Sequence, residues 1–202
     1  SRLLVEVGLG YLKIGQPSPS LSGGESQRIK LVKYLSRSSL SGVLFLLDEP
    51  STGLHPQDVT RLLAIINRLV KSRATVLIIE HNADVIKAAD WVIDLGHGAG
   101  PSGGKVIYSG PAAGLQRVAD SVTAQAIYAP HSESVPGAPL PKVTRQTNEL
   151  HIKNARVHNL NGVSVKIPKP SLTVVTGVSG SGKSSLVIDV LESEAKRRFL
   201  ES

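Results

Sequence analysis

The 202-residue sequence contains no cysteine, no methionine and few aromatic residues. Without cysteine the chain can form neither disulfides nor thiolate metal sites, a composition that suits a reducing cytoplasm. The absence of methionine, even at position 1, indicates a segment of a longer protein. No apolar run approaches the roughly 20 residues of a membrane-spanning helix, and residues 1–4 do not resemble a signal peptide. We therefore expect a cytoplasmic protein with no membrane partner.

The composition is otherwise that of a globular protein. Hydrophobic residues make up 41% of the chain, and its length allows one good core or two partial ones. The net charge of +7 is compatible with nucleic acid or another polyanion. The basic residues are scattered and aromatic residues make up only 3%, so charge alone does not distinguish a DNA-binding surface from a solvated one.

Apolar runs and helical stripes alternate along the first part of the sequence. A short continuous apolar run is typical of a strand buried on both faces, whereas apolar residues at helical spacing predict an amphipathic helix. The expected elements are strands at 43–47, 75–79 and 91–95, helices from 56 and at 83–89, and a glycine-rich turn at 96–104 leading into 105–109. This alternation predicts an α/β fold with helices flanking a layered sheet.

A second pattern begins after residues 130–148, where prolines and small polar residues predict an exposed linker. Antiparallel strands are expected at 150–157 and 163–167, followed by a strand at 172–176 and a helix after Lys183. We therefore predict two partial modules, residues 1–129 and 149–202, joined by the linker 130–148.

The segment 177–184 matches the phosphate-loop pattern G-x-x-x-x-G-K-[ST] in full, after a strand and before a helix. Glycines let backbone N–H groups surround phosphates, and the helix N-terminus adds its positive end. Lys183 would reach the β- and γ-phosphates, and the Ser184 hydroxyl would bind Mg²⁺. The predicted nucleotide-binding residues here are Gly177, Val178, Ser179, Gly180, Ser181, Gly182, Lys183, Ser184 and Ser185.

Two acidic residues, Asp48 and Glu49, end a predicted buried strand. Asp48 would hold Mg²⁺ through water, and Glu49 would act as the general base that polarises the attacking water. His81 follows the strand at 75–79 and would contact the γ-phosphate. The alternatives are an acidic pair that caps the next helix and a structural histidine.

The sequence Leu21-Ser22-Gly23-Gly24-Glu25 combines two exposed glycine amides with a hydroxyl at a predicted helix N-terminus. Ser22, Gly23 and Gly24 could therefore donate hydrogen bonds to a γ-phosphate delivered from elsewhere. Taken alone, the same string could be merely a capped helix.

Together these motifs resemble the signature, Walker B, D-loop and switch histidine of an ABC-type ATPase. The resemblance is closer to the UvrA family, the DNA-repair ATPases of excinuclease ABC, and it covers nearly the whole chain except the linker. It rests on the segments 7–12, 21–31, 48–55, 80–82, 88–96, 159–160, 176–186 and 194–202.

This resemblance implies a P-loop ATPase that uses ATP and Mg²⁺ within a nucleotide excision repair system. It implies binding to damaged double-stranded DNA, loading of the helicase-like excinuclease component UvrB, and a homodimer. Family members also bind zinc through paired cysteines, so any zinc is expected only in parts of the protein outside this sequence. The Q-loop between phosphate loop and signature is missing as well.

The order of the motifs is reversed relative to an ordinary module, because the phosphate loop comes last. In this family two modules pair head to tail, with each ATP between them. The resemblance thus implies that Lys183 and the loop Ser22–Gly24 face one nucleotide, while Asp48, Glu49 and His81 serve another. The first part resembles the family's second module and the last part its first, as in a tandem duplication or a divergent paralogue.

Three alternatives remain open from the sequence. The chain could come from an ABC transporter ATPase, which would lack zinc modules, or from a related drug-resistance protein that does not repair DNA. It could also be a circularly permuted single ATPase, in which case Lys183 and Asp48 would share one nucleotide.

Overall fold

The computed structural model describes residues 29, 31, 34, 35, 37, 39–128 and 148–201. The loop Ser22–Gly24 and the predicted linker up to residue 147 lie outside these residues. No helix within the described ranges is long and apolar enough to cross a membrane.

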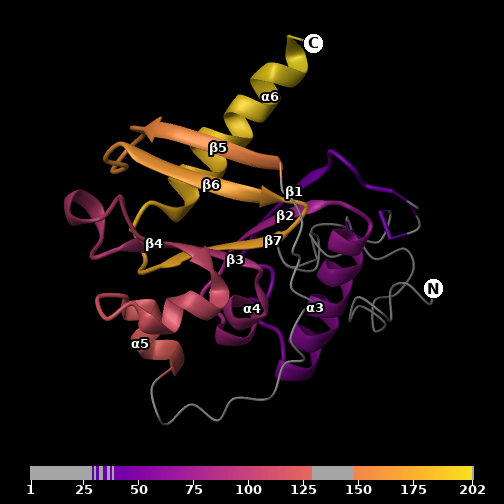
Figure 1. Cartoon of the computed structure of the whole chain (residues 1–202), viewed down its shortest axis with the longest axis horizontal. Helices are drawn as coiled ribbons and strands as arrows, with labels where there is room; N and C mark the ends of the chain where they lie inside the picture. The colour runs from indigo at the N-terminus through magenta and orange to yellow at the C-terminus, as the bar shows by residue number, and fades with distance from the viewer. Residues whose placement is uncertain are drawn as a thin grey trace.

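The centre of the structure is a five-stranded sheet with the order β1-β2-β7-β3-β4 (Figure 1). The first four strands in this order are parallel, and β4 pairs antiparallel to β3. This arrangement confirms the predicted layered α/β fold. The strands are β1 (Leu44–Asp48), β2 (Thr75–Ile79), β3 (Trp91–Gly96), β4 (Lys105–Pro111) and β7 (Leu172–Gly177).

Strand β7 joins the two parts of the chain that the sequence divided into separate modules. It lies between β2 and β3, pairing Ile79 with Val175 on one side and Leu95 with Gly177 on the other. Every residue of β2 is buried, as are the first five residues of β7, as expected for parallel strands covered on both faces. The structure therefore contains one shared sheet where the sequence predicted two partial ones.

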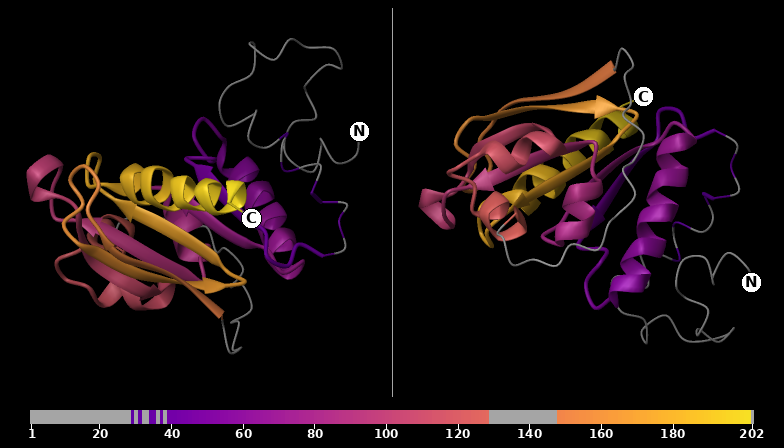
Figure 2. Two further views of the ribbon diagram at one scale, coloured as in Figure 1. Left: turned by 90° about the horizontal axis from the view of Figure 1, so that it is seen from above. Right: turned by 60° about the horizontal axis from the view of Figure 1, so that its bottom comes forward.

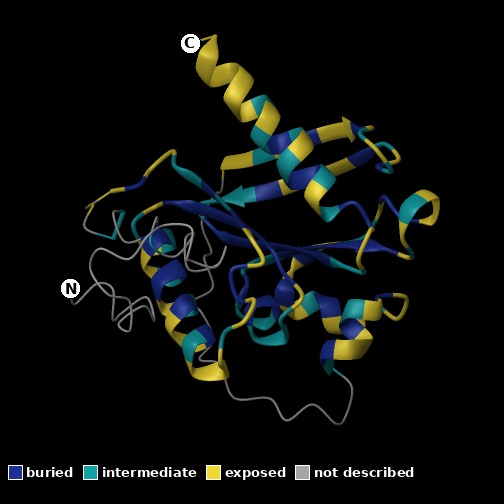
Figure 3. Cartoon of the chain, turned by 180° about the vertical axis from the view of Figure 1, so that it is seen from behind, coloured by how far each residue is buried: buried dark blue, intermediate teal, exposed yellow. Residues whose placement is uncertain are grey.

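One face of the sheet is covered by helices α3 (Pro56–Lys71), α4 (Ala83–Ala88) and α5 (Val122–Tyr128), with the short helix η3 (Ala112–Arg117) beside them. Helix α3 begins as predicted, with Pro56 in its first turn and the His55 side chain accepting a hydrogen bond from the Gln57 N–H. Figure 3 shows its buried stripe facing the sheet. That stripe consists of Val59, Leu62, Ile65, Ile66 and Leu69.

The opposite face is covered by the hairpin β5 (Asn148–Ala155) and β6 (Val163–Lys169) and by the C-terminal helix, η4 (Ser185–Glu192) continuing into α6 (Ser193–Leu200). Figure 2 shows these elements on the side of the sheet away from α3. Strand β5 ends at Ala155, earlier than the predicted residue 157. Its pairing with β6 is irregular between Ile152 and Ala155, where Asn154 has a φ of 53°.

The helix predicted after Lys183 is present but is not a regular α-helix throughout. Its first part is π-helical, and the Phe199 side chain near its end is 80% exposed. Two surface ion pairs lie along it, Lys196–Glu192 at 2.6 Å and Arg198–Glu194 at 2.7 Å.

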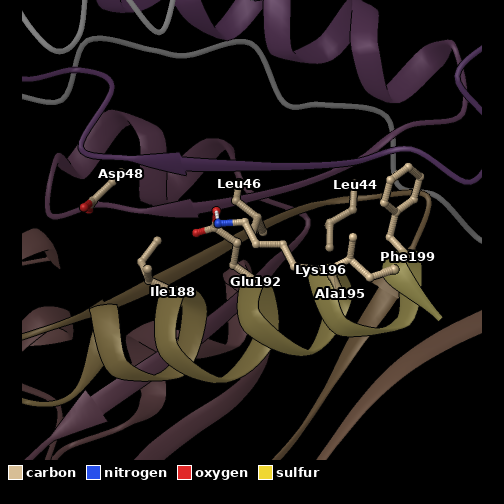
Figure 4. A pocket seen from close by; sticks show the side chains of 9 residues that line it. Leu44, Leu46, Asp48, Ile188, Glu192, Ala195, Lys196 and Phe199 are labelled. Atoms are coloured by element: carbon tan, nitrogen blue, oxygen red, sulfur yellow. Dashed lines mark ion pairs between the residues drawn. The ribbon is translucent and has the colours of Figure 1, made fainter.

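A groove of about 640 Å³ runs between β1 and this helix (Figure 4). Its walls are mostly apolar, and Asp48 lies at one end. A groove of this composition offers few hydrogen-bond donors to phosphate, and none of the predicted phosphate-loop residues lines it.

Candidate phosphate-binding and hydrolytic site

The phosphate loop connects the end of β7 to helix η4, as the motif requires. Three of its glycines have positive φ angles, 130° at Gly177, 73° at Gly180 and 103° at Gly182. A side chain at Gly177 would place its Cβ only 1.9 Å from the carbonyl oxygen of Leu95. Glycine is therefore required at this position by backbone conformation and by close packing against β3.

Lys183 lies against the backbone of this loop. Its Nζ donates hydrogen bonds to the carbonyl oxygens of Gly177 and Val178, each at 3.0 Å. Burial lowers the pKa of Lys183, while the carboxylates of Glu49, Asp48 and Asp94 act in the opposite direction. The ammonium is thus held in the loop and experiences the charge of the acidic residues at the end of β1.

The other predicted residues of the loop differ in accessibility. Ser179, Gly180 and Ser184 are exposed, whereas Ser181 and Gly182 are buried and Ser185 is half-buried. The Ser181 hydroxyl is buried without a hydrogen-bond partner among the described residues. The Ser184 hydroxyl is therefore more accessible than that of Ser181, and its role as a metal ligand stays a prediction.

A second glycine-rich segment fastens the phosphate loop in place. The Gly100 N–H, at the start of η2 (Gly100–Ser102), donates to the Gly180 carbonyl at 3.1 Å, and the Gly104 N–H donates to the Ser181 carbonyl at 2.9 Å. The side-chain amide of Asn159 donates hydrogen bonds to two carbonyl oxygens, that of Gly180 at 3.0 Å and that of Gly100 at 3.3 Å. The sequence pattern did not predict these hydrogen bonds of Asn159, because a side chain that bridges two loops leaves no periodic signal.

The acidic residues lie at the carboxyl end of β1. Glu49 has a φ of 43°, uncommon for a residue other than glycine, and its N–H donates to the Ile79 carbonyl at 2.9 Å. Burial raises the pKa of Asp48, with further increases from Glu49 and Glu80 and a decrease from Lys183. Carboxylates that repel one another in this way favour a bound cation.

His81 follows β2 and faces Glu49. Its Nδ1 lies 3.7 Å from Glu49 Oε1, and the two side chains are 69% and 47% exposed. Both side chains therefore reach the same open edge of the sheet and remain accessible to a ligand.

These features come together because parallel strands present their carboxyl ends at one edge of the sheet, where α/β proteins commonly bind ligands. Asp48 ends β1 and Glu49 follows it, while His81 lies just beyond β2. Lys183 lies beyond β7, the strand next to β2. The sequence predicted that Lys183 and the acidic pair serve different nucleotides, whereas the structure brings Lys183 close enough to Glu49 and Asp48 for their charges to act on it. The reason is that sequence order does not determine strand order, and β7 lies next to β2.

The donor set suits a magnesium ion held partly by a substrate. The predicted ligands Asp48 and Ser184 would supply oxygen atoms, which Mg²⁺ prefers, and Mg²⁺ commonly uses one or two carboxylates together with phosphate oxygens. Within the described residues no group of three or more His, Cys, Asp or Glu side chains could hold a metal ion. The residues thus fit Mg²⁺ bound with a nucleotide rather than an all-protein metal site.

Comparison with known proteins identifies close relatives. UvrABC system protein A of Streptomyces avermitilis is 44% identical over 198 residues, which cover 98% of this chain and 19% of that protein. UvrABC system protein A of Thermus thermophilus is 41% identical over 201 residues, covering 98% of this chain and 20% of the relative. No family model matches the chain.

The fold agrees with these relatives. The crystal structure of UvrA2 from Deinococcus radiodurans matches with a TM-score of 0.61 and 40% identity, covering 98% of this chain and 24% of that one. The chain therefore spans only about a fifth to a quarter of the proteins it matches. By sequence and fold together, the chain is similar, over nearly its whole length, to one part of the UvrABC system protein A proteins.

Proposed function

We propose that this chain supplies an ATP-binding and ATP-hydrolysing site of a DNA-damage-recognition protein. The observation that carries the proposal is the arrangement of the phosphate loop next to Asp48, Glu49 and His81 at one edge of a single sheet. The whole-chain similarity to UvrABC system proteins supports the same function and favours it over a membrane-transport ATPase.

In the proposed site, backbone N–H groups of 177–184 bind the phosphates, and Lys183 turns from the loop carbonyls toward the β- and γ-phosphates. Ser184 and Asp48 would hold Mg²⁺, which supplies charge neutralisation between the phosphates. Glu49 takes the proton of the attacking water, and His81 donates a hydrogen bond to the γ-phosphate. This assignment makes one nucleotide common to Lys183 and Asp48, the circularly permuted alternative from the sequence.

For the intact protein we propose the wider role of the family. ATP bound between head-to-tail modules would drive scanning of damaged double-stranded DNA and loading of the helicase-like excinuclease component UvrB. The signature residues Ser22, Gly23 and Gly24 would complete a nucleotide site across such an interface, and the protein would act as a homodimer. Zinc would be bound only by parts of the protein outside this sequence, and the module division at 130–148 stays a prediction.

A substitution in the phosphate loop tests the nucleotide site directly. Lys183→Ala in the intact protein should abolish ATP binding at this site, because the loop loses its only ammonium. Lys153→Ala, at an exposed lysine on β5, is the matched control and should bind ATP as the native protein does. Native ATP stoichiometry and hydrolysis rate in Lys183→Ala would refute the assignment.

A second experiment tests the role in repair. Binding of the intact protein to damaged and undamaged duplex should be compared at one stated salt concentration, since salt controls the nonspecific part of the affinity. The repair function predicts a preference for damaged duplex that changes with ATP. Equal binding to both duplexes would favour the drug-resistance alternative.

A further inference from the structure

Glu80 is a charged residue in the interior of the protein. It follows the last residue of β2 and is 0% exposed, although sequence alone would place a glutamate after a strand in solvent. Burying a carboxylate is costly unless hydrogen-bond donors replace its water. The contacts of Glu80 therefore indicate why a carboxylate is retained at this position.

Three backbone N–H groups surround this carboxylate. Oε1 accepts a hydrogen bond from Ser51 at 3.0 Å, and Oε2 accepts from His81 at 2.8 Å and from Asn82 at 2.9 Å. Hydrogen bonds to an ionised acceptor are stronger than those between neutral groups. The two carboxylate oxygens thus bind two different segments of the chain.

Each of these segments carries a residue of the proposed hydrolytic site. Ser51 belongs to the turn that follows β1, which is closed by a hydrogen bond from the Thr52 N–H to the Glu49 carbonyl at 3.1 Å. The other donors belong to His81 itself and to Asn82. The backbone N–H of Glu80 also donates to the Val175 carbonyl in β7 at 3.1 Å. One residue therefore connects the Glu49 turn, the His81 segment and the strand that enters the phosphate loop.

We propose that Glu80 is a positioning residue that fixes Glu49 and His81 relative to each other and to the phosphate loop. The inference rests on the proposed function of this site. Glu49 has a left-handed backbone conformation that most residues avoid, so its surroundings must hold it there. The bond from Ser51 to Glu80 holds the turn two residues away and keeps the Glu49 carboxylate facing His81.

Glu80→Gln in the intact protein is the sharpest test, because the amide has the same shape but only one acceptor oxygen. That oxygen can serve either Ser51 or the pair His81 and Asn82, and the amide –NH₂ then faces the remaining N–H donors. The matched control is Asp90→Asn, which changes a carboxylate that accepts from the Leu172 N–H at 2.7 Å, at the opposite end of β7.

The measurements are kcat and KM for ATP hydrolysis above the Lys183→Ala baseline, the affinity for ATP, and the thermal midpoint. We expect Glu80→Gln to lower kcat by at least about tenfold while ATP affinity changes by less than about threefold, because the phosphate loop itself is untouched. When Glu49→Gln is already present, adding Glu80→Gln should lower kcat little further, since Glu80 acts through Glu49 and His81. Asp90→Asn should keep a native kcat.

A folded Glu80→Gln variant with native kcat would overturn the inference, as would parallel losses in kcat and ATP affinity or full additivity with Glu49→Gln. If Glu80→Gln does not fold, Glu80→Asp provides the test, because it keeps the charge but shortens the reach, and a native kcat there overturns the inference equally. Failure of the proposed function is distinguishable, since Lys183→Ala would then bind and hydrolyse ATP normally.

Discussion

The Nδ1 atom of His81 lies 3.7 Å from Oε1 of Glu49, and the two residues come from adjacent strand ends. Thr52 adds a hydroxyl that donates to the other Glu49 oxygen at 3.4 Å. The carboxylate is therefore oriented from two sides while remaining partly exposed. Residues arranged in this way act as a unit, so single substitutions are expected to give losses that do not add.

Combining substitutions at Lys183 and Glu49 tests whether they share a nucleotide. Glu49→Gln alone should trap ATP in the intact protein and lower single-turnover hydrolysis by about 100-fold or more, because the general base is lost. In the double variant with Lys183→Ala, this trapped ATP should disappear, since the same phosphates lose their lysine.

The number of ATP molecules retained per chain after rapid gel filtration checks this prediction. If the double variant retained as much ATP as Glu49→Gln, the two residues would belong to separate nucleotides, as the motif order first suggested.

Gly177→Ala should disrupt the start of the phosphate loop. The added Cβ would meet the Leu95 carbonyl at 1.9 Å in a backbone of positive φ, so we expect a loss in unfolding free energy of about 3 kcal/mol or more. Gly53→Ala is the control, because φ is also positive there but nothing lies within 4 Å, and about 1 kcal/mol is expected. Denaturant unfolding of both variants provides the comparison, and equal losses would show that packing against β3 is unimportant.

Asn159→Ala should weaken ATP binding without touching the phosphate loop sequence. The amide holds Gly180 and Gly100 together, and losing one such hydrogen bond costs about 1 kcal/mol, or roughly fivefold in affinity if the free loop becomes disordered. Titration with a fluorescent ATP analogue measures the change. Asn148→Ala, at an exposed position on β5, should leave affinity unchanged. An unchanged affinity in Asn159→Ala would mean that the remaining backbone bonds suffice to hold the loop.

Asp94 gives the stability of the chain a defined pH dependence. Burial raises its pKa above the ordinary 3.8, although Ser121 and Thr123 donate hydrogen bonds to it at 2.6 and 2.9 Å. The folded state therefore keeps this proton to higher pH than the unfolded state. The stability that the proton provides is complete below pH 3.8 and is lost as pH rises through the folded pKa.

Asp94→Asn removes this titration, so unfolding free energy should decline less between pH 3.8 and neutrality than in the native chain. Denaturant titrations at several pH values measure the slope. An identical slope in the variant would assign the decline to other groups.

Much of the fold could be predicted from local patterns in the sequence. The apolar run before Asp48 forms β1 within one residue of its expected bounds, and helix α3 begins at Pro56 as its position indicated. The phosphate loop lies between a strand and a helix as its motif required. These features depend on residues close together in the chain, and short-range periodicity records them well.

The relationships between distant residues could not be predicted in the same way. A proline-rich stretch indicated that the segments around it were independent, yet β7 pairs with β2 and β3. Strand pairing depends on which apolar surfaces fit together in three dimensions, and a one-dimensional pattern does not contain that information. Glu80 was missed for the same reason, because its three donors come from two segments.

The central place of β7 also affects how the protein reaches its native state. Its two neighbours are synthesised well before it, and the contact between Ile79 and Val175 closes a long loop. Closing long loops costs entropy and slows folding relative to local contacts. The phosphate loop can therefore reach its place beside the ends of β1 and β2 only after β7 has paired between β2 and β3, so this part of the proposed site forms after its neighbours have been synthesised.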